Sequence, residues 1–204
     1  MMITHDCIQL SPAWFELRRG IPTACNFDRI LTPKTMKLAA AADDFICELI
    51  AERFHLGPIH DLGPSPSKAM LHGTNTEPEA RRFYAMDSGL EVQQAGFCTT
   101  DDGRFGCSPD GLVGAEGLLE LKCPLGKTHV GYLLAGELPS EYRAQCHGQL
   151  IVCGRQWLDF LSYVPGLPPF KVRVVPDDFT RALMVALEQF HERLEKAIQR
   201  IKEM

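Results

Sequence analysis

Several features that define common protein classes are missing from this sequence. It has no apolar run near the roughly 18 residues of a membrane span, which excludes a transmembrane helix and any membrane partner reached through one. The first residues, MMITHDCIQLSPAW, lack a basic segment followed by an apolar one, so we expect no secretory signal and a cytoplasmic location. Repeats and low-complexity segments are absent. The 204 residues are therefore expected to form one domain, residues 1–204.

Metal and redox motifs built on cysteine are also missing. The eight cysteines include no Cys-x-x-Cys pair, the usual spacing in zinc ribbons and thiol redox sites. They also lack the clustered spacing of an iron–sulfur nuclease. The seven histidines are scattered, which favours structural or surface roles over metal ligation.

The charge is mildly acidic, with a net value of -5 and a pI near 5.8. Proteins that bind nucleic acid usually carry a basic surface, so this total argues mildly against such a partner. Residues 1–40 differ, because five Lys and Arg residues there outnumber three Asp and Glu residues and leave a net +2. A local basic face is compatible with the sequence.

Capping residues and apolar spacing predict both helices and strands. Ser11 followed by Pro12 is typical of a helix start, and Ser140 is expected to cap a later helix. The predicted helices cover 11–20, 23–31, Thr35 to His55, 72–89, 140–153 and 183–201, with a Pro- and Gly-rich surface loop at 57–68. The predicted strands cover 90–100, 104–114, 118–124, 156–164 and 170–175. We therefore expect an α+β (α/β) fold with a central mixed β-sheet, mostly from residues 90–175, flanked by α-helices.

Four charged residues interrupt the apolar stretch GCSPDGLVGAEGLLELKCP: Glu116 lies in a predicted turn, and Asp110, Glu120 and Lys122 lie in or beside the predicted strands. Alternate side chains of a strand share a face, so Glu120 and Lys122 are expected to point together. Asp110 ends the preceding strand of a predicted hairpin and is expected to meet Glu120 across it. Two carboxylates and an ammonium repel or desolvate one another there unless a cation neutralises them, and a hard divalent cation with oxygen ligands does so well.

Such a set of residues fits phosphodiester hydrolysis. Mg²⁺ held by one or two carboxylates withdraws charge from phosphoryl oxygens and lowers the pKa of a bound water. Lys122 beside it would orient that water or stabilise the developing negative charge. The alternative is a plain salt bridge between a carboxylate and Lys122 on a solvated sheet face, which is common and contributes little to stability.

Five sequence blocks resemble a known family. Asp110 in SPDG and Glu120-x-Lys122 in LELKCP form the signature of the PD-(D/E)xK nuclease superfamily. Together with AWFELRRGIPTA, GTNTEPEARRFY and YRAQCHGQL, they occur in the order and approximate spacing of the lambda exonuclease group, also called YqaJ-like viral recombinases. The resemblance covers about residues 11 to 165 and implies the nuclease core of that superfamily.

The resemblance also implies roles for individual residues. The family's metal ligands fall on Asp110, Glu120 and the backbone carbonyl of Leu121, and its active-site lysine falls on Lys122. Two further catalytic residues of the family, a helix-borne acid and a glutamine near the attacking water, fall on Glu77 and Gln145.

Ordinary structural roles also fit three positions in these blocks. Thr74-x-x-Glu77 matches a capping box, in which the carboxylate only satisfies a helix N-terminus. Gln149, one turn after Gln145, is predicted to be a polar residue on the helix surface. Trp14, which aligns with a family tryptophan, is predicted to be a core residue.

The family's pocket for a terminal 5′ phosphate falls on Arg18 and Cys25. An arginine offers a planar, permanently charged donor fork for phosphate, although Arg18 also fits the pattern of a helix-surface residue. Relatives place a serine where this chain has Cys25, a weaker donor, which leaves its backbone N–H as the group suited to an anion. Met70 and Leu71 fall where relatives carry an apolar wedge that splits the duplex end; the alternative is a core anchor.

Membership of this family implies a Mg²⁺-dependent exonuclease, with Mn²⁺ as a substitute, that enters at double-stranded DNA ends. It would degrade one strand 5′ to 3′ and leave a 3′ single strand for phage-type recombination. The family also implies a ring-shaped homotrimer and a single-strand annealing protein as partner. Two alternatives remain open: an endonuclease of the same superfamily in restriction or repair, and a non-catalytic DNA-binding module.

Overall fold

The computed structural model describes residues 2–55 and 67–204, so the predicted surface loop at 57–68 lies almost wholly outside the described residues. The α-helices are α1 (Pro12–Arg18), α2 (Ala42–Phe54), α3 (Lys68–Ser88), α4 (Gly126–Ala135), α5 (Ser140–Cys153) and α6 (Asp178–Lys202), with a 3-10 helix η1 (Ala24–Arg29). No described helix is long and apolar enough to cross a membrane.

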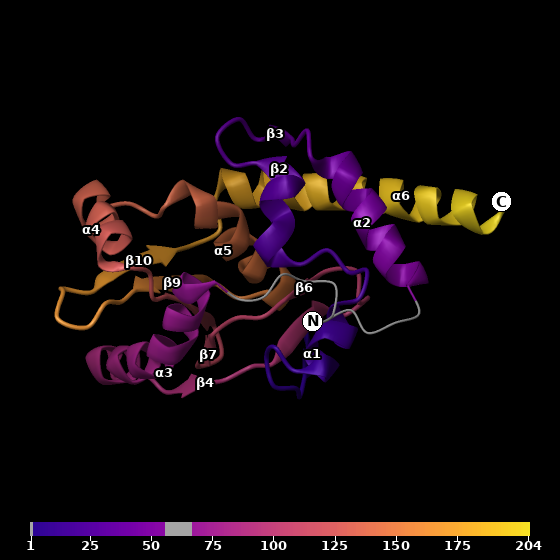
Figure 1. Cartoon of the computed structure of the whole chain (residues 1–204). Coiled ribbons are helices and arrows are strands. Elements are labelled where there is room, and N and C mark those ends of the chain that lie inside the picture. Colours follow the sequence, from indigo (N-terminus) through magenta and orange to yellow (C-terminus); the bar gives the residue numbers. More distant parts are fainter. Residues whose placement is uncertain (1, 56–66) are drawn as a thin grey trace.

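A mixed sheet of five strands lies at the centre of the fold (Figure 1). Its strands, in spatial order, are β10 (Phe170–Val174), β9 (Trp157–Ser162), β8 (Gly117–Lys122), β7 (Gly111–Val113) and β4 (Val92–Gln93). Strands β8 and β9 pair in parallel and the other neighbours antiparallel. A parallel pair needs a long crossover, which α4 and α5 supply. The predicted α+β fold with a central mixed sheet is therefore confirmed.

Two smaller sheets complete the strand content of the described residues. An antiparallel sheet joins β1 (Met2–His5), β5 (Phe97–Thr100) and β6 (Gly106–Cys107). The two-stranded sheet joins β2 (Leu31–Thr32) and β3 (Lys37–Leu38).

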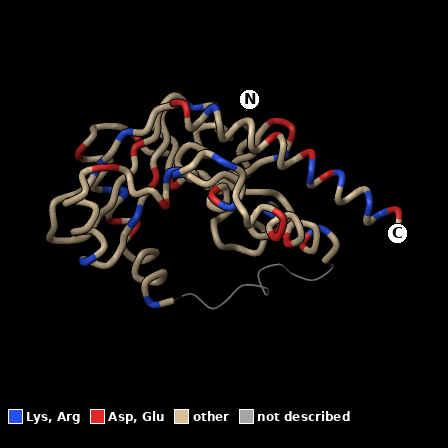
Figure 2. The backbone as a smooth tube through the Cα atoms, turned by 90° about the horizontal axis from the view of Figure 1, so that it is seen from above, with Lys and Arg blue, Asp and Glu red and all other residues tan. Residues whose placement is uncertain are grey.

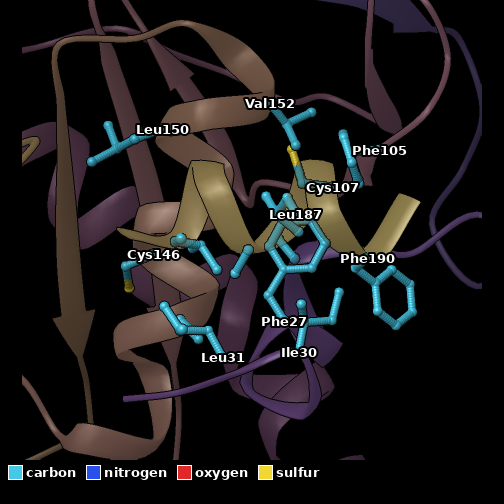
Figure 3. Close-up of a cluster of buried hydrophobic side chains, with 14 of the residues drawn as sticks. Phe27, Ile30, Leu31, Phe105, Cys107, Cys146, Leu150, Val152, Leu187 and Phe190 are labelled. Carbon is cyan, nitrogen blue, oxygen red and sulfur yellow. The ribbon is translucent and has the colours of Figure 1, made fainter. Parts of the chain in front are cut away.

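Helices cover both faces of the central sheet. The side chains of β8 alternate between these two faces and therefore enter two separate hydrophobic clusters. Leu119 and Leu121 pack with Ala80 and Tyr84 of α3 on one face. Leu118 joins the larger core on the other face, which is built with α5, α6, α2 and η1. Figure 3 shows the centre of that core, where Phe27 and Leu187 meet residues of α5.

Helix α6 closes the larger core. Asp177 and Thr180 form a capping box at its start, in which each side chain accepts a hydrogen bond from the other residue's backbone N–H. One side of the helix is buried in the core, and acidic and basic positions are interspersed along its length (Figure 2). The predicted amphipathic C-terminal helix is confirmed.

Several local predictions were wrong. The strands expected at 90–100 and 104–114 each divide between the central sheet and the sheet of β1, β5 and β6. The helix expected from Thr35 starts only at Ala42, because residues 31–38 form the β2–β3 hairpin and Met36 adopts a left-handed φ of 51°. Ser140 is the first helical residue of α5 and makes no side-chain cap. Helix α4, with three glycines at or beside its ten residues, was not predicted.

Candidate active site

The hairpin of β7 and β8 brings Asp110 and Glu120 together. Gly111 pairs with Leu119, which places Asp110, the next residue out, opposite Glu120. The Asp110 backbone N–H donates to the Leu119 carbonyl over 3.1 Å, and the Leu121 N–H donates to Asp110 Oδ2 over 2.6 Å. The meeting predicted from strand alternation is confirmed.

Glu120 is 1% exposed and its carboxylate is surrounded by donors. Oε1 accepts hydrogen bonds from Lys122 Nζ and, over 2.7 Å, from Gln145 Nε2. Oε2 accepts one from Gln149 Nε2 over 2.6 Å. A salt bridge on a solvated sheet face is therefore the wrong description of this pair, because the carboxylate is buried.

Gln149 lies in the site and not on the helix surface as predicted. It is 1% exposed, and its Oε1 is a buried acceptor with no hydrogen-bond partner among the described residues. Gln145 and Gln149 are one turn apart on α5, so the same helix face holds both oxygens of Glu120. The four-residue spacing between Gln145 and Gln149 was the sequence feature that could have placed Gln149 on the same helix face as Gln145.

Buried negative charge dominates the electrostatics. Burial, followed by the neighbouring Glu120 carboxylate, raises the pKa of Asp110 well above its ordinary value, and Glu77 adds to the effect. Burial lowers the pKa of Lys122, but Glu120 and Asp110 outweigh it and raise the pKa above its usual range. Lys122 therefore remains a cation, and the carboxylates favour a further positive charge beside them.

Helix α3 brings Glu77 to the same place. Glu77 Oε1 accepts a hydrogen bond from Arg81, whose Nε also donates to the Asp110 carbonyl over 3.2 Å. The capping-box interpretation of Glu77 is wrong, because α3 begins at Lys68 and Thr74, in its interior, donates to the Met70 carbonyl. Arg81 was missed, although its four-residue spacing from Glu77 is typical of a helical ion pair.

The donors present suit a hard divalent cation. Asp110 and Glu120 supply carboxylate oxygens, and the backbone of Leu121, the residue after Glu120, lies against Asp110 Oδ2. Among residues 2–55 and 67–204, no three His, Cys, Asp or Glu side chains form a ready-made metal-binding group. Mg²⁺ is usually held by one or two carboxylates and keeps several waters, so the Asp110 and Glu120 carboxylates fit this ion.

Arg18 and Cys25 also meet. An Arg18 terminal nitrogen donates to Thr23 Oγ1 over 3.1 Å and lies 3.3 Å from Cys25 Sγ, while its guanidinium stacks 4.1 Å from the Trp14 ring centre. Arg18 is thus partly buried and fixed by its contacts, unlike a free helix-surface arginine. The Thr23 hydroxyl, two residues before Cys25, accepts the Arg18 hydrogen bond and lies 3.2 Å from Cys25 Sγ, and sequence reasoning missed this contact.

Trp14 and Met70 have distinct surroundings. Trp14 is buried, as predicted, and its Nε1 donates to Ser108 Oγ over 2.8 Å, two residues before Asp110. Met70 and Leu71 lie in the first turn of α3 and are 61% and 50% exposed, so the core-anchor interpretation is wrong.

Comparisons with known proteins show which family and which solved structures the chain is similar to. Residues 13–156 match the family model described as YqaJ-like viral recombinase domain. The fold is similar to that of an alkaline exonuclease from Laribacter hongkongensis, with 34% identity, a TM-score of 0.80, and coverage of 95% of this chain and 97% of that one. The same exonuclease in complex with dAMP gives a TM-score of 0.79 at 34% identity, covering 95% and 97% of the two chains.

A more distant structure shares the fold alone. A phage-related exonuclease from Haemophilus somnus is 14% identical, with a TM-score of 0.60 over 87% of this chain and 96% of that one. Curated proteins give no match.

Proposed function

Because this chain belongs to the family of YqaJ-like viral recombinase domains, we propose that it degrades DNA from duplex ends, 5′ to 3′, with Mg²⁺ bound at Asp110 and Glu120. The chain is a deoxyribonuclease of the exonuclease type, by its family and by its 34% identity to an alkaline exonuclease across 95% of its length. The observation that carries the proposal is the Asp110–Glu120 pair beside the Lys122 ammonium.

Each residue around the Asp110–Glu120 pair has its own proposed role. Asp110, Glu120 and the Leu121 carbonyl would hold the cation, which withdraws charge from the phosphoryl oxygens and lowers the pKa of a bound water. Lys122, kept cationic by its neighbours, stabilises negative charge that develops on the phosphate. Gln145, held against Glu120, is positioned to orient the attacking water. Mn²⁺ would substitute for Mg²⁺, since it accepts the same oxygen ligands.

Glu77 contributes from α3. Its carboxylate lies near enough to raise the pKa of Asp110 and is held by Arg81. We assign Glu77 to the catalytic set, where it would accept hydrogen bonds from cation-bound water, a role suited to a carboxylate that is not itself a first ligand.

The 5′-to-3′ direction rests on Arg18. Its guanidinium is preorganised by Trp14 and Thr23 and would receive a terminal 5′ phosphate, with Cys25 contributing its backbone N–H. Exposed Met70 would act as the wedge at the duplex end, because apolar side chains of this kind part stacked bases. The neighbouring exonuclease was solved with dAMP, a mononucleotide, which supports release of single nucleotides here.

The assembly and partners follow from the family. A homotrimeric ring around the DNA and a single-strand annealing protein that coats the 3′ strand would place this chain in phage-type recombination. Native mass spectrometry tests the ring directly: a mass of three chains is expected, and a stable monomer at micromolar concentration would contradict it.

Digestion of matched DNA substrates tests the proposed function. Linear duplex, covalently closed circle and nicked circle are each incubated with the protein and Mg²⁺. We expect loss of the linear duplex, with 5′-phosphorylated ends preferred, and survival of the closed circle. Nicking of the closed circle would favour an endonuclease of the same superfamily. Binding without cleavage of any substrate would favour a non-catalytic DNA-binding module.

Arg18→Ala tests the direction separately. The variant should lose the preference for 5′-phosphorylated ends, because alanine has no charged donor fork for phosphate. Arg200→Ala, at the far end of α6, is the matched control and should keep that preference. An unchanged preference in Arg18→Ala would remove Arg18 from the phosphate pocket.

A further inference from the structure

Three cysteines that have no role in the proposed nuclease chemistry meet inside the larger core. Cys98 of β5 is the cross-strand partner of Cys107 of β6, and Cys153 is the last residue of α5. All three are buried, with exposed fractions of 0%, 1% and 6% in that order. Figure 3 shows Cys107 within the buried cluster that also contains Val152, the residue before Cys153. The fold thus gathers thiols from three separate elements.

Two of these sulfur atoms are in direct contact. Cys107 Sγ and Cys153 Sγ lie 3.5 Å apart, although the two residues are 46 positions apart in the chain. A disulfide bond is about 2.05 Å long, so the two sulfurs need to approach each other by only about 1.5 Å. That movement is on the scale of a change in side-chain rotamer. The pair is therefore placed for a bond that would join strand β6 to the end of α5.

We propose that Cys107 and Cys153 form a reversible disulfide when the protein is exposed to a peroxide. Cys153 is the most exposed of the three thiols and reacts first: its Sγ attacks one peroxide oxygen, the O–O bond breaks, and a sulfenic acid and one water form. Cys107 Sγ then attacks Cys153 Sγ and displaces the hydroxyl group as a second water. Two thiols lose two electrons and two protons, and one peroxide is reduced to two waters.

Burial makes this oxidation slow. It raises the pKa of the Cys107 thiol well above its usual range, and the thiolate is the nucleophilic form. The disulfide should therefore form over minutes to hours. Cys25 and Cys47 are exposed and should react with peroxide sooner, so each control variant has to keep these two thiols.

The segment that the disulfide would close contains most of the proposed catalytic residues. Asp110, Glu120 and Lys122 lie between the two cysteines in the chain, and so do Gln145 and Gln149. A disulfide stabilises a protein mainly by restricting its unfolded chain, and the effect grows with the length of the closed loop. For cysteines 46 positions apart, the unfolding temperature should rise by about 5–10 °C.

Peptide mapping of the whole protein tests whether the bond forms. The protein is incubated with hydrogen peroxide, its remaining thiols are blocked, and it is digested with trypsin without reductant. Fragments 105–122 and 144–155 then carry Cys107 and Cys153, while Cys98 lies in a separate fragment. We expect these two fragments to be joined after oxidation and to separate again on treatment with dithiothreitol.

Cys153→Ala and Cys146→Ala are a matched pair of variants. Both cysteines are buried on α5 and fall in the same tryptic fragment, and both variants keep the exposed thiols. Cys146→Ala should keep the cross-link and the peroxide-dependent rise in unfolding temperature. Cys153→Ala should lose both. Circular dichroism of the reduced variants shows whether each is folded, and the mapping of the parent decides the central point without either variant.

Three results would overturn the inference. The first is a parent whose fragments 105–122 and 144–155 stay unlinked after overnight oxidation, and the second is a cross-link from Cys107 to Cys98 in place of Cys153. The third is a cross-linked protein that unfolds at the same temperature as the reduced one. These measurements do not involve DNA, so their outcome is independent of whether linear duplex is degraded.

Discussion

The Gln149 amide donates a 2.6 Å hydrogen bond to Glu120 Oε2, while Gln145, one turn earlier on α5, donates to Oε1. Both oxygens of the buried carboxylate are thus held by one helix face. A carboxylate that binds a cation keeps its orientation through such outer contacts, and their loss commonly costs 10- to 100-fold in metal affinity or activity. Helix α5 therefore positions the site from behind the sheet.

Gln149→Leu should weaken the site without unfolding it. The substitution removes the donor to Glu120 Oε2 and also removes the unpartnered Oε1, which is a buried polar group with its own cost. We expect an activity loss of roughly 10- to 100-fold and a higher Mg²⁺ concentration at half-maximal rate. Steady-state rates across a Mg²⁺ titration measure both.

Gln156→Leu is the control for that variant. It breaks an exposed glutamine–glutamate hydrogen bond, Gln156 Nε2 to Glu116 Oε1 over 2.9 Å, outside the site. Its Mg²⁺ dependence should match the parent. An unchanged Mg²⁺ requirement in Gln149→Leu would show that the amide does not position Glu120.

Cation affinity should rise with pH. Burial and Glu120 raise the pKa of Asp110, so in the cation-free protein this carboxyl keeps its proton to a higher pH than usual. A cation binds only the deprotonated form, so binding releases a proton and strengthens as pH increases through that pKa. Calorimetry across the pH range in which the protein stays folded, in buffers of different ionisation enthalpy, measures the release.

Asp110→Asn should abolish that proton release together with most of the affinity. Mg²⁺ affinity that stays constant over the same pH range in the parent would be inconsistent with a protonated Asp110 in the cation-free site.

Tyr84 ties the helix that carries Glu77 to the central sheet. Its hydroxyl donates to Asp159 Oδ2 over 2.8 Å, and Asp159, 3% exposed, is also bound by Arg173 at both oxygens. Tyr84→Phe should lower the free energy of unfolding by about 1.5–3 kcal/mol, the usual contribution of a hydrogen bond to a charged group. Urea denaturation measures the loss.

Tyr163→Phe provides the comparison for Tyr84→Phe. It removes a similar hydroxyl–carboxylate bond, to Glu79 over 2.7 Å, at the exposed surface. Its cost should stay within about 0.5 kcal/mol. If both variants lost the same free energy of unfolding, burial of the hydrogen bonds around Asp159 would make no extra contribution to stability.

His147 should make stability depend on pH. Burial lowers its pKa below the ordinary value of 6.5, against the smaller opposing effect of Asp177. The unfolded chain therefore binds a proton more readily than the folded one, so this contribution to stability is complete above about pH 6.5 and declines as pH falls toward the folded-state pKa. Urea midpoints at several pH values should fall on acidification, and less steeply in His147→Gln. Parallel slopes would exclude His147 as the cause.

The sequence predicted the parts of the site that depend on strand geometry. Alternation along residues 117–122 was enough to place Glu120 and Lys122 on one face, and the hairpin register brought Asp110 to them. Residues whose roles depend on helix packing were harder. Helix α5 is covered on nearly all sides over 144–153, so helical periodicity does not separate its surface positions from buried Gln149.

Contacts between residues far apart in the sequence could not be predicted from local sequence patterns. Strand β1 pairs with Phe97–Thr100, nearly a hundred residues away, and nothing in the first five residues indicates that partner. Arg81 resembles an ordinary surface charge until its contact with the Asp110 carbonyl is known. Thr23 was hidden for a similar reason, since only the turn before η1 brings its hydroxyl to Arg18.

Anomalous diffraction from crystals soaked in Mn²⁺ tests the whole account most directly. A single strong peak within coordination distance of both Asp110 and Glu120, lost in Glu120→Gln, is the predicted result. Fully occupied Mn²⁺ elsewhere in the molecule, with none between these two carboxylates, would contradict it.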